Sequence, residues 1–192
     1  MKRLVVFLVL FLCLIFSLCF VWVYWREHSQ DRVILAAARQ YSADPALIKA
    51  IVWRESWFNP KARGRVGEMG LMQLREAAAG EWAATTRLPD FTVEHLFNAR
   101  TNVLVGTWYL QKLLKRYGTT DNPVPYALAD YNAGRANVLK WNKGAAATNS
   151  ASFIDQIGFP STRRYVRAVM KRRDLYGPAF PTNQVAASGR IE

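Results

Sequence analysis

The 192 residues have room for one domain and a short appendage. Their 26 lysines and arginines against 14 acidic residues give a net charge of +12, which indicates an anionic partner. The two cysteines, Cys13 and Cys19, lie in one apolar segment, and this excludes a fold held together by disulfides. The rest of the chain must therefore be stabilised by its hydrophobic core.

An apolar run near the N-terminus comes first in the chain. Between Leu4 and Trp25 no residue is charged, and Ser17 is the only one outside the apolar set. A helix of this length spans about 33 Å, enough for the hydrocarbon core of a bilayer. The run ends in bulky aromatic residues suited to a membrane interface, not in the small residues of a cleaved signal peptide, and neither cysteine has the preceding small residue of a lipoprotein signal. We therefore expect residues 1–25 to be an uncleaved transmembrane anchor, with a cleaved signal as the alternative.

Charges on either side of the run predict its orientation. Lys2 and Arg3 precede it, whereas Arg26, Glu27 and His28 nearly balance on the other side. By the positive-inside rule the N-terminus is cytoplasmic, and the domain that follows a single pass through the inner membrane is exported. Export argues against nucleic acid as the anionic partner.

Residues 26–176 are predicted to form one mostly helical domain, because strand signals are nearly absent. Asp44 and Pro45 are typical of an N-cap and first helical turn, and they open a helix that ends at Glu55. The other predicted helices are recognised by composition, apolar spacing and end signals, and they cover residues 31–41, 71–84, 101–117, 123–132, 135–141 and 162–176.

The segments between these helices are predicted to be loops. Residues 59–70 contain several glycines, residues 89–97 are a connector, and residues 144–152 are small, polar and expected to be flexible. Gly177 ends the last helix together with the proline that follows it. Residues 177–192 are expected to form a flexible tail.

Glu55 stands out because it falls on the apolar stripe of its helix. It lies three, four and seven residues after Val52, Ile51 and Ile48, where a carboxylate is costly to bury. Desolvation and the negative end of the helix both favour the neutral acid, so the pKa is expected to rise as a general acid requires. The alternative is a glutamate paired with Arg54 or another cation.

Four short motifs follow one another along the chain. They are Glu55-Ser56, then Gly-Leu-Met-Gln at 70–73, Tyr-Asn-Ala-Gly at 131–134 and Thr-Arg-Arg-Tyr-Val at 162–166. In this order, over residues 31–176, the chain resembles the catalytic domain of soluble-lytic-transglycosylase (SLT) murein enzymes, relatives of goose-type lysozyme. The resemblance implies a mostly α, lysozyme-like single domain after the N-terminal transmembrane helix. It also makes bacterial peptidoglycan, with its peptide-stem carboxylates, the expected anionic partner.

The resemblance also implies a chemistry. In this family one glutamate, here Glu55, acts first as acid and then as base. The substrate's N-acetyl group is thought to stabilise the anomeric carbon, and the muramyl 6-hydroxyl attacks it. This cleaves the MurNAc-β-1,4-GlcNAc bond and leaves a 1,6-anhydroMurNAc end.

The other family motifs imply further site residues. Ser56 is expected to hydrogen-bond the sugar, with a helix-end hydroxyl as the alternative, and Met72 and Gln73 to line the glycan groove. The phenol of Tyr131, paired with Asn132 in the motif, is expected to hydrogen-bond the catalytic carboxylate. Tyr165 is expected near the glutamate, with a place in the core as the alternative.

Two positions fit the family less well. Ser161 stands where the family often has a supporting glutamate. Glu68, in the glycine loop, is predicted to approach the site, where it would raise the pKa of Glu55, bind substrate or position a water. The alternative for Glu68 is an acceptor for backbone N–H groups of its own loop.

No cofactor or metal is expected, because His28 and His95 lie far apart without partners at ligand spacing.

The leading functional prediction is a membrane-anchored lytic transglycosylase with its catalytic domain on the periplasmic side. A hydrolytic muramidase on the same fold, with Glu68 assisting a water, is the first alternative. A non-catalytic glycan-binding scaffold of an envelope-spanning machine is the second. The alternative for the basic residues is a solvated face, together with a helix that also touches anionic lipid headgroups.

Overall fold

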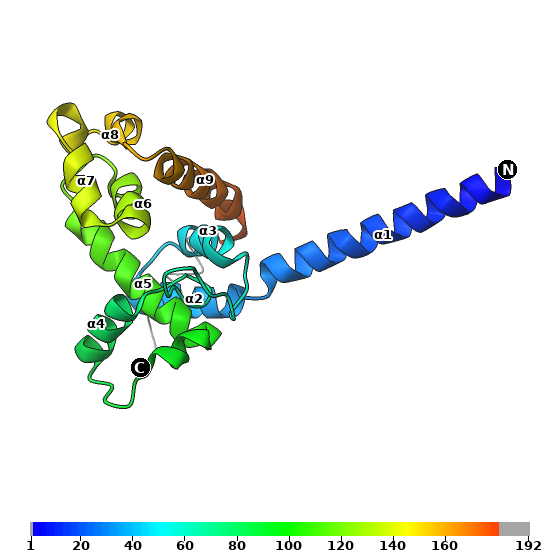
Figure 1. The fold of residues 1–192 in the computed structure, drawn as a ribbon, viewed down its shortest axis with the longest axis horizontal. Coiled ribbons are helices and arrows are strands. Elements are labelled where there is room, and N and C mark those ends of the chain that lie inside the picture. Colours follow the sequence, from blue (N-terminus) through cyan, green and yellow to red (C-terminus); the bar gives the residue numbers. More distant parts are fainter. Residues whose placement is uncertain (1, 181–192) are drawn as a thin grey trace.

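The chain is mostly helical in its described part, residues 2–180 of a computed structural model (Figure 1). Within these residues the backbone forms no strand, only two isolated bridges, from Arg63 to Met69 and from Met69 to Leu74. The elements are α1 (Lys2–His28), α2 (Asp31–Tyr41), α3 (Pro45–Ser56), α4 (Glu76–Thr86), η1 (Val93–Phe97), α5 (Ala99–Arg116), α6 (Pro123–Ala133), α7 (Arg135–Trp141), η2 (Gly144–Ala147), α8 (Ser150–Gln156), α9 (Pro160–Tyr176) and η3 (Gly177–Ala179).

Except for its last turns, the N-terminal helix α1 stands away from the rest of the molecule (Figure 1). None of its residues is buried, and its middle carries apolar side chains on every face. Among the described residues, the helix that begins with α1 is long and apolar enough to cross a membrane. This length and composition agree with either an anchor or a signal sequence.

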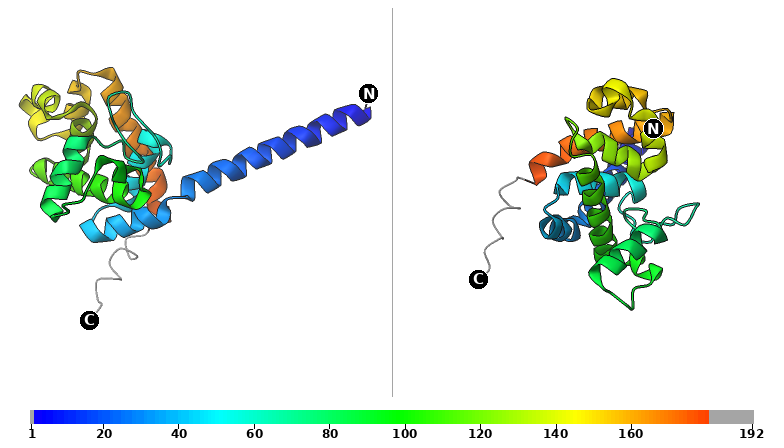
Figure 2. Two further views of the ribbon diagram at one scale, coloured as in Figure 1. Left: turned by 60° about the horizontal axis from the view of Figure 1, so that its bottom comes forward. Right: turned by 90° about the vertical axis from the view of Figure 1, so that its left-hand side faces the viewer.

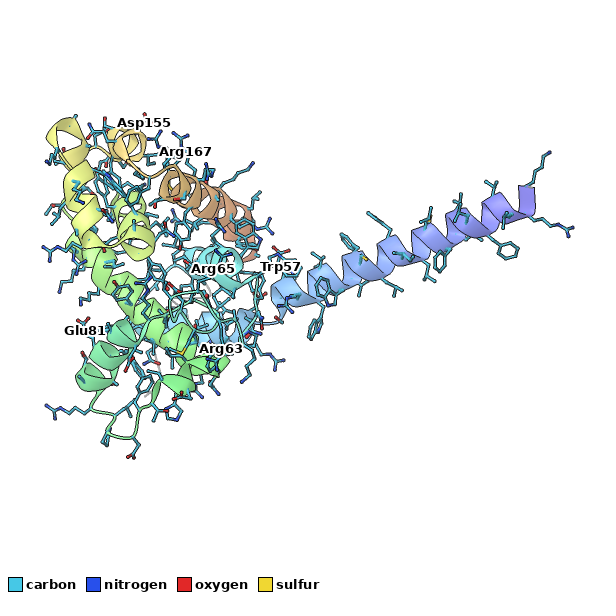
Figure 3. The ribbon with its side chains drawn as sticks, viewed as in Figure 1. Trp57, Arg63, Arg65, Glu81, Asp155 and Arg167 are labelled. Atoms are coloured by element: carbon cyan, nitrogen blue, oxygen red, sulfur yellow. The ribbon has the colours of Figure 1, made fainter. Side chains whose placement is uncertain are left out.

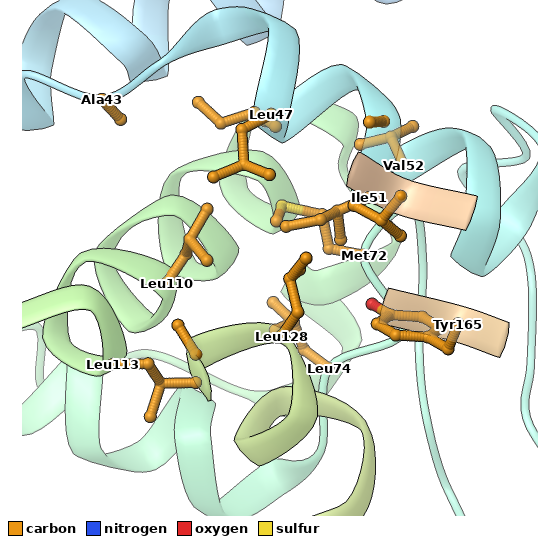
Figure 4. Packing of buried hydrophobic residues seen from close by; sticks show 14 of the residues in the cluster. Ala43, Leu47, Ile51, Val52, Met72, Leu74, Leu110, Leu113, Leu128 and Tyr165 are labelled. Atoms are coloured by element: carbon orange, nitrogen blue, oxygen red, sulfur yellow. The ribbon is translucent and has the colours of Figure 1, made fainter. Parts of the chain in front are cut away.

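The helix that carries Glu55, α3, lies at the centre of the domain. It packs against α9 on one side and against α2 on the other, while α5 packs on α2 and α6. Asp44 caps α3 by accepting hydrogen bonds from the N–H groups of Ala46 and Leu47, as the sequence predicts. Ile51 and Val52 point from α3 into a core that Leu110 and Leu128 of α5 and α6 complete (Figure 4).

The helix predicted for residues 71–84 is wrong at its start, because α4 begins only at Glu76. Residues 69–74 form a turn closed by backbone hydrogen bonds between Met69 and Leu74. Gly70 and Gln73 both have positive φ values, 73° and 47°, which no α-helix accommodates. The buried side chain of Asn102 on α5 fixes this turn by bonding the carbonyl of Met69 and the N–H of Met72.

The flexible loop predicted for residues 144–152 is also wrong, since η2 and α8 occupy most of it. Asn149 caps α8 with its side-chain oxygen, and Phe153 is fully buried against the ring of Tyr126, 4.0 Å between centroids. The hydroxyl of Tyr126 donates to the carbonyl of Ala146 at 2.8 Å. Tertiary packing therefore orders a segment whose composition is typical of a mobile loop.

The C-terminal end of the domain agrees with the predicted stop after α9. Of the tail predicted for residues 177–192, the first part forms η3 and the buried Phe180, whose ring lies over the Lys49 ammonium. Residues 181–192 of that predicted tail lie outside the described part of the chain.

Candidate active site

Glu55 lies at the C-terminal end of α3, in the wall of a cleft of about 390 Å³. Trp57 and Phe58, which follow the helix, both adopt left-handed conformations, with φ of 50° and 61°. Bulky residues rarely do so, and such strain gathers at functional sites. The reversal ends α3 directly after Ser56, so the carboxylate stands at the end of the helix facing the cleft.

Burial governs the charge of the Glu55 carboxyl. Desolvation raises its pKa to about 7, although a hydrogen bond from Tyr165 and the charge of Arg54 oppose the rise and Glu68 adds slightly to it. Glu55 forms no ion pair with any residue in the described range, so the alternative of a salt bridge to Arg54 is not met. A carboxyl that is about half protonated near neutral pH has the property of a general acid.

Two tyrosines, the buried Tyr165 and the half-buried Tyr131, flank this carboxyl. The hydroxyl of Tyr165 on α9 donates to Glu55 Oε1 at 2.7 Å, while that of Tyr131 on α6 donates to the carbonyl of Met72 at 2.7 Å. Burial, and then the nearby Glu55, raise the pKa of both phenols, so each remains a donor. The predicted bond from Tyr131 to the carboxylate is thus wrong in this structure, because Tyr131 holds the 70–73 turn and Tyr165 takes the carboxylate.

The Ser56 and Met72 side chains lie behind the cleft. The Ser56 hydroxyl donates to the carbonyl of Leu71 at 2.8 Å, which ties α3 to the turn. Met72 is fully buried between α3 and α5 (Figure 4), and its sulfur fills the space over Gly106, where a Cβ would meet it at 2.2 Å. The predicted glycan contact therefore does not fit the Met72 side chain, and Ser56 follows its alternative as a helix-end hydroxyl.

Gln73, from the turn before α4, and Asn132, from α6, both line the cleft. Gln73 sits on the left-handed turn and donates from its amide to the carbonyl of Gly70 at 2.9 Å. Asn132 is exposed, and its side-chain oxygen accepts from the hydroxyl of Thr162 at 2.8 Å, so its NH₂ group makes no hydrogen bond within residues 2–180. Both side chains can offer hydrogen bonds to a ligand in the cleft.

Glu68 also lines the cleft, on the wall formed by the loop before α4. It accepts from the Arg75 guanidinium at 2.8 Å and from the N–H of Val66 at 3.1 Å. Burial alone would raise its pKa, but the hydrogen bonds and charge of Arg75 and the backbone N–H groups outweigh it and hold the pKa below its ordinary value. Glu68 thus approaches the site and caps its own loop at the same time.

Two supporting residues escaped the sequence analysis. Asn102 fixes the turn that carries Gln73, and an asparagine directly before the buried Val103 was the available signal. Asp130, next to the Tyr-Asn motif, is buried and accepts from Arg116 at 2.6 Å and from the Tyr117 hydroxyl. Ser161, which the sequence analysis placed where the family often has a supporting glutamate, is exposed at the start of α9.

Comparison with known proteins reveals likeness over most of the domain. The family model for the transglycosylase SLT domain matches residues 32–154. The soluble lytic murein transglycosylase of Salmonella typhimurium is 35% identical over 123 residues, which cover 63% of this chain and 19% of that protein. A putative soluble lytic murein transglycosylase of Haemophilus influenzae is 34% identical over 136 residues, 70% of this chain and 22% of its own length. The chain thus spans about a fifth of these relatives.

Solved structures show the same likeness in three dimensions. An inactive mutant of the lytic transglycosylase Slt from Pseudomonas aeruginosa superposes with a TM-score of 0.72 at 28% identity, over 79% of this chain and 24% of that one. The 70 kDa soluble lytic transglycosylase from Escherichia coli superposes with a TM-score of 0.63 at 29% identity, over 77% of this chain and 24% of that one. The mostly α, lysozyme-like fold class expected from the sequence is confirmed.

Proposed function

The chain belongs to the transglycosylase SLT family, as its four motifs predicted, and from this premise we propose that it is a lytic transglycosylase of peptidoglycan. It cleaves the MurNAc-β-1,4-GlcNAc bond and leaves a 1,6-anhydroMurNAc end. The relatives whose names include murein transglycosylase support this substrate class. The observation that carries the proposal is the buried Glu55 carboxyl, with its pKa of about 7, in the wall of an open cleft.

In the proposed reaction Glu55 transfers one proton in each direction. The neutral carboxyl donates its proton to the glycosidic oxygen as the bond to the anomeric carbon breaks. The resulting anion, held by the Tyr165 hydroxyl, then accepts the proton of the muramyl 6-hydroxyl, whose oxygen bonds to the same carbon. No water is consumed and the acid is regenerated.

The intramolecular hydroxyl has a proximity advantage over water. Tyr165 is a positioning residue in this reaction, because its hydrogen bond fixes the rotamer of the Glu55 carboxylate and stabilises the anionic form of that carboxylate. Gln73, Asn132 and Glu68 are proposed to bind the glycan, since all three line the cleft. Tyr131, which also lines the cleft, and Ser56, which does not, hold the turn by donating hydrogen bonds to its carbonyls.

A hydrolytic muramidase is the second candidate function, and the position of Glu68 favours it. Its carboxylate is ionised by Arg75 and shares the cleft with Glu55, so it can accept a proton from an attacking water. A non-catalytic scaffold of an envelope machine is disfavoured, because a pure binder gains nothing from a desolvated acid.

Analysis of the products separates the three functions. The full chain is incubated with purified murein, and the soluble fragments are analysed by mass spectrometry before and after borohydride reduction. Transglycosylase products are one water lighter than muramidase products and resist reduction, which is our expectation. Reducible ends as the main product would assign the muramidase, and binding without any soluble fragment would assign the scaffold.

We further propose that residues 1–25 are an uncleaved anchor in the inner membrane, followed by the catalytic domain in the periplasm. The apolar α1 supports this division of the chain. A phosphatase fused after Glu192 is expected to be active, and carbonate washing is expected to leave the full-length chain in the membrane pellet. A mature N-terminus near residue 26 would identify a cleaved signal instead.

A further inference from the structure

The last turns of α1 are bound to the catalytic domain through an aromatic and cationic stack. The rings of Trp22 and Trp57 lie 5.3 Å apart, and the Arg26 guanidinium lies 5.7 and 5.3 Å from their centroids. Arg26 Nε also donates to the carbonyl of Trp57 at 2.9 Å. Trp22 belongs to the apolar run of α1, so Trp57 is held at the level where that run ends.

A second set of contacts fixes α1 from the side of α9. The Arg172 guanidinium pairs with Glu27 at 2.6 Å, and the Tyr176 hydroxyl donates to the same carboxylate. Lys49, which is fully buried, pairs with Asp31 at 2.6 Å at the start of α2. The domain is therefore attached to α1 in one orientation by contacts on two sides.

The segment after Trp57 carries a basic surface next to this attachment. We call residues 57–66 the basic loop; its exposed side chains include Lys61, Arg63 and Arg65, and none of these three cations pairs with a carboxylate within residues 2–180. Val66 is 66% exposed and Trp57 38% exposed. The loop lies on the side of the domain from which α1 leaves (Figures 2 and 3).

We propose that the basic loop docks on anionic phospholipid headgroups and seats the catalytic domain on the bilayer surface; this rests on the proposed membrane anchor. Tryptophan prefers the membrane interface, and lysines and arginines close to anionic lipid are attracted to it. The packing of Trp57 on Trp22 places the start of the loop at headgroup level, which selects lipid over other anions.

Docking would connect the bilayer to the active site through a short path. Glu55 lies two residues before Trp57, and Glu68 two residues after Val66, so the basic loop joins the two carboxylates of the cleft. A loop held on headgroups keeps the cleft at one height above the membrane. Glycan strands at that height would be the ones cleaved.

A fluorescent probe at the loop tests the proposal in the full chain. Cys13 and Cys19 are replaced by alanine, and Val66→Cys carries an environment-sensitive dye; Leu139→Cys, 53% exposed on α7, is the control position. The chains are reconstituted in vesicles of pure phosphatidylcholine or of equimolar phosphatidylcholine and phosphatidylglycerol. We expect a blue shift and reduced iodide quenching at position 66 only in the anionic vesicles, and no difference at position 139.

Matched charge variants make the result specific. Lys61→Ser, Arg63→Ser and Arg65→Ser together are expected to lower the docked population by roughly 100-fold and abolish the shift. The control variant removes the same exposed charge from the region of α7, with the substitutions Arg135→Ser, Lys140→Ser and Lys143→Ser. It is expected to keep the blue shift of the probe at position 66. Both variants should still cleave murein.

The outcomes separate this inference from the proposed function. If the chain does not float with either kind of vesicle, the membrane anchor fails and the docking fails with it. If it floats but position 66 reports the same environment in both vesicles, or the loop variant keeps the shift, only the docking is overturned. Protection of the probe by purified murein in place of anionic vesicles would also overturn it, since the loop would then bind the wall.

Discussion

Glu55 and Glu68 line the same cleft, yet their surroundings drive their pKa values in opposite directions. Glu55 is desolvated at the end of α3 and its pKa rises to about 7. Glu68 lies in a loop where Arg75 and the N–H of Val66 hold its pKa below the ordinary value. Near neutral pH one carboxyl can therefore give a proton, and the other stays an anion.

The surroundings of each carboxyl therefore give two chemically identical side chains different roles. We call the surroundings of Glu55, formed by α3, α6 and α9, the buried wall; it desolvates the Glu55 carboxyl and provides the Tyr165 hydroxyl as a donor. We call the loop before α4, which carries Glu68, the loop wall; it provides the Arg75 cation and backbone N–H donors to the Glu68 carboxylate. Substitutions that remove one of these contributions should change the behaviour of one carboxyl more than that of the other.

Replacing the acid should have the largest effect. Glu55→Gln keeps the shape of the side chain but cannot deliver a proton, so murein cleavage should fall at least about 100-fold. Release of soluble fragments from murein measures this, with the exposed Glu94→Gln as the matched control that keeps activity. A Glu55→Gln chain with more than about a tenth of the activity would show that Glu55 is not the acid.

The same substitution should change how stability depends on pH. The folded state holds the proton of Glu55 up to a pH of about 7, whereas the unfolded state loses it near 4.5, so wild-type stability falls as pH rises between these values. Glu55→Gln lacks this loss, and above pH 7 it should be more stable by up to about 3 kcal/mol. Urea unfolding in detergent micelles at acidic and alkaline pH measures the difference. An equal gain at both pH values would mean that the carboxyl is not desolvated.

The buried wall was largely predictable from the sequence, since Glu55 on an apolar stripe and the Asp44 cap are local patterns. Which tyrosine would donate a hydrogen bond to Glu55 was not predictable from the sequence. Whether Tyr131 or Tyr165 reaches Glu55 depends on how α6 and α9 pack on α3, and Tyr165 lies 110 positions away from Glu55 in the chain.

The loop wall was harder to predict, because its conformation is imposed from elsewhere. Residues 71–75 have the composition of a helix start. However, Asn102 on α5 accepts a hydrogen bond from the N–H of Met72, and Gln73 adopts a left-handed conformation, so these residues form a turn instead of a helix. Residues 144–152 were predicted to be a flexible loop because they are small and polar, although they form η2 and the start of α8. The cap at Asn149, with Phe153 and Ile157 at helical spacing, was the signal that could have revealed it.

Tyr165→Phe should widen the difference in pKa between Glu55 and Glu68 without removing the acid. Losing a hydrogen bond to the anion costs at least about tenfold in activity. Because that bond lowers the pKa of Glu55, its loss should raise the pKa further and move the alkaline limb of the pH–activity profile upward. Tyr126→Phe, another buried phenol, is the control that should leave the profile unchanged. A fall in rate with an unshifted profile would make the role of Tyr165 purely structural.

Glu68→Gln should have the smallest effect if the lytic mechanism holds. Glu68 is held by Arg75 in the more exposed loop wall and adds only slightly to the pKa of Glu55. Removing its charge should move the alkaline limb slightly downward and change the total rate by less than about fivefold. The anhydro ends should stay the main product, because the attacking hydroxyl belongs to the substrate.

The product ratio turns this small effect into a decisive one. If Glu68 activates water, Glu68→Gln should remove the reducing ends while the anhydro ends persist. If it binds glycan, both products should fall together and the substrate concentration for half-maximal rate should rise. Arg75→Gln, which keeps the carboxylate but removes its cation, is the matched comparison: it should raise the pKa of Glu68 and weaken any water activation only at acidic pH, where the carboxylate becomes protonated. A loss of both products by 100-fold in Glu68→Gln would mean that the two carboxyls act as a catalytic pair.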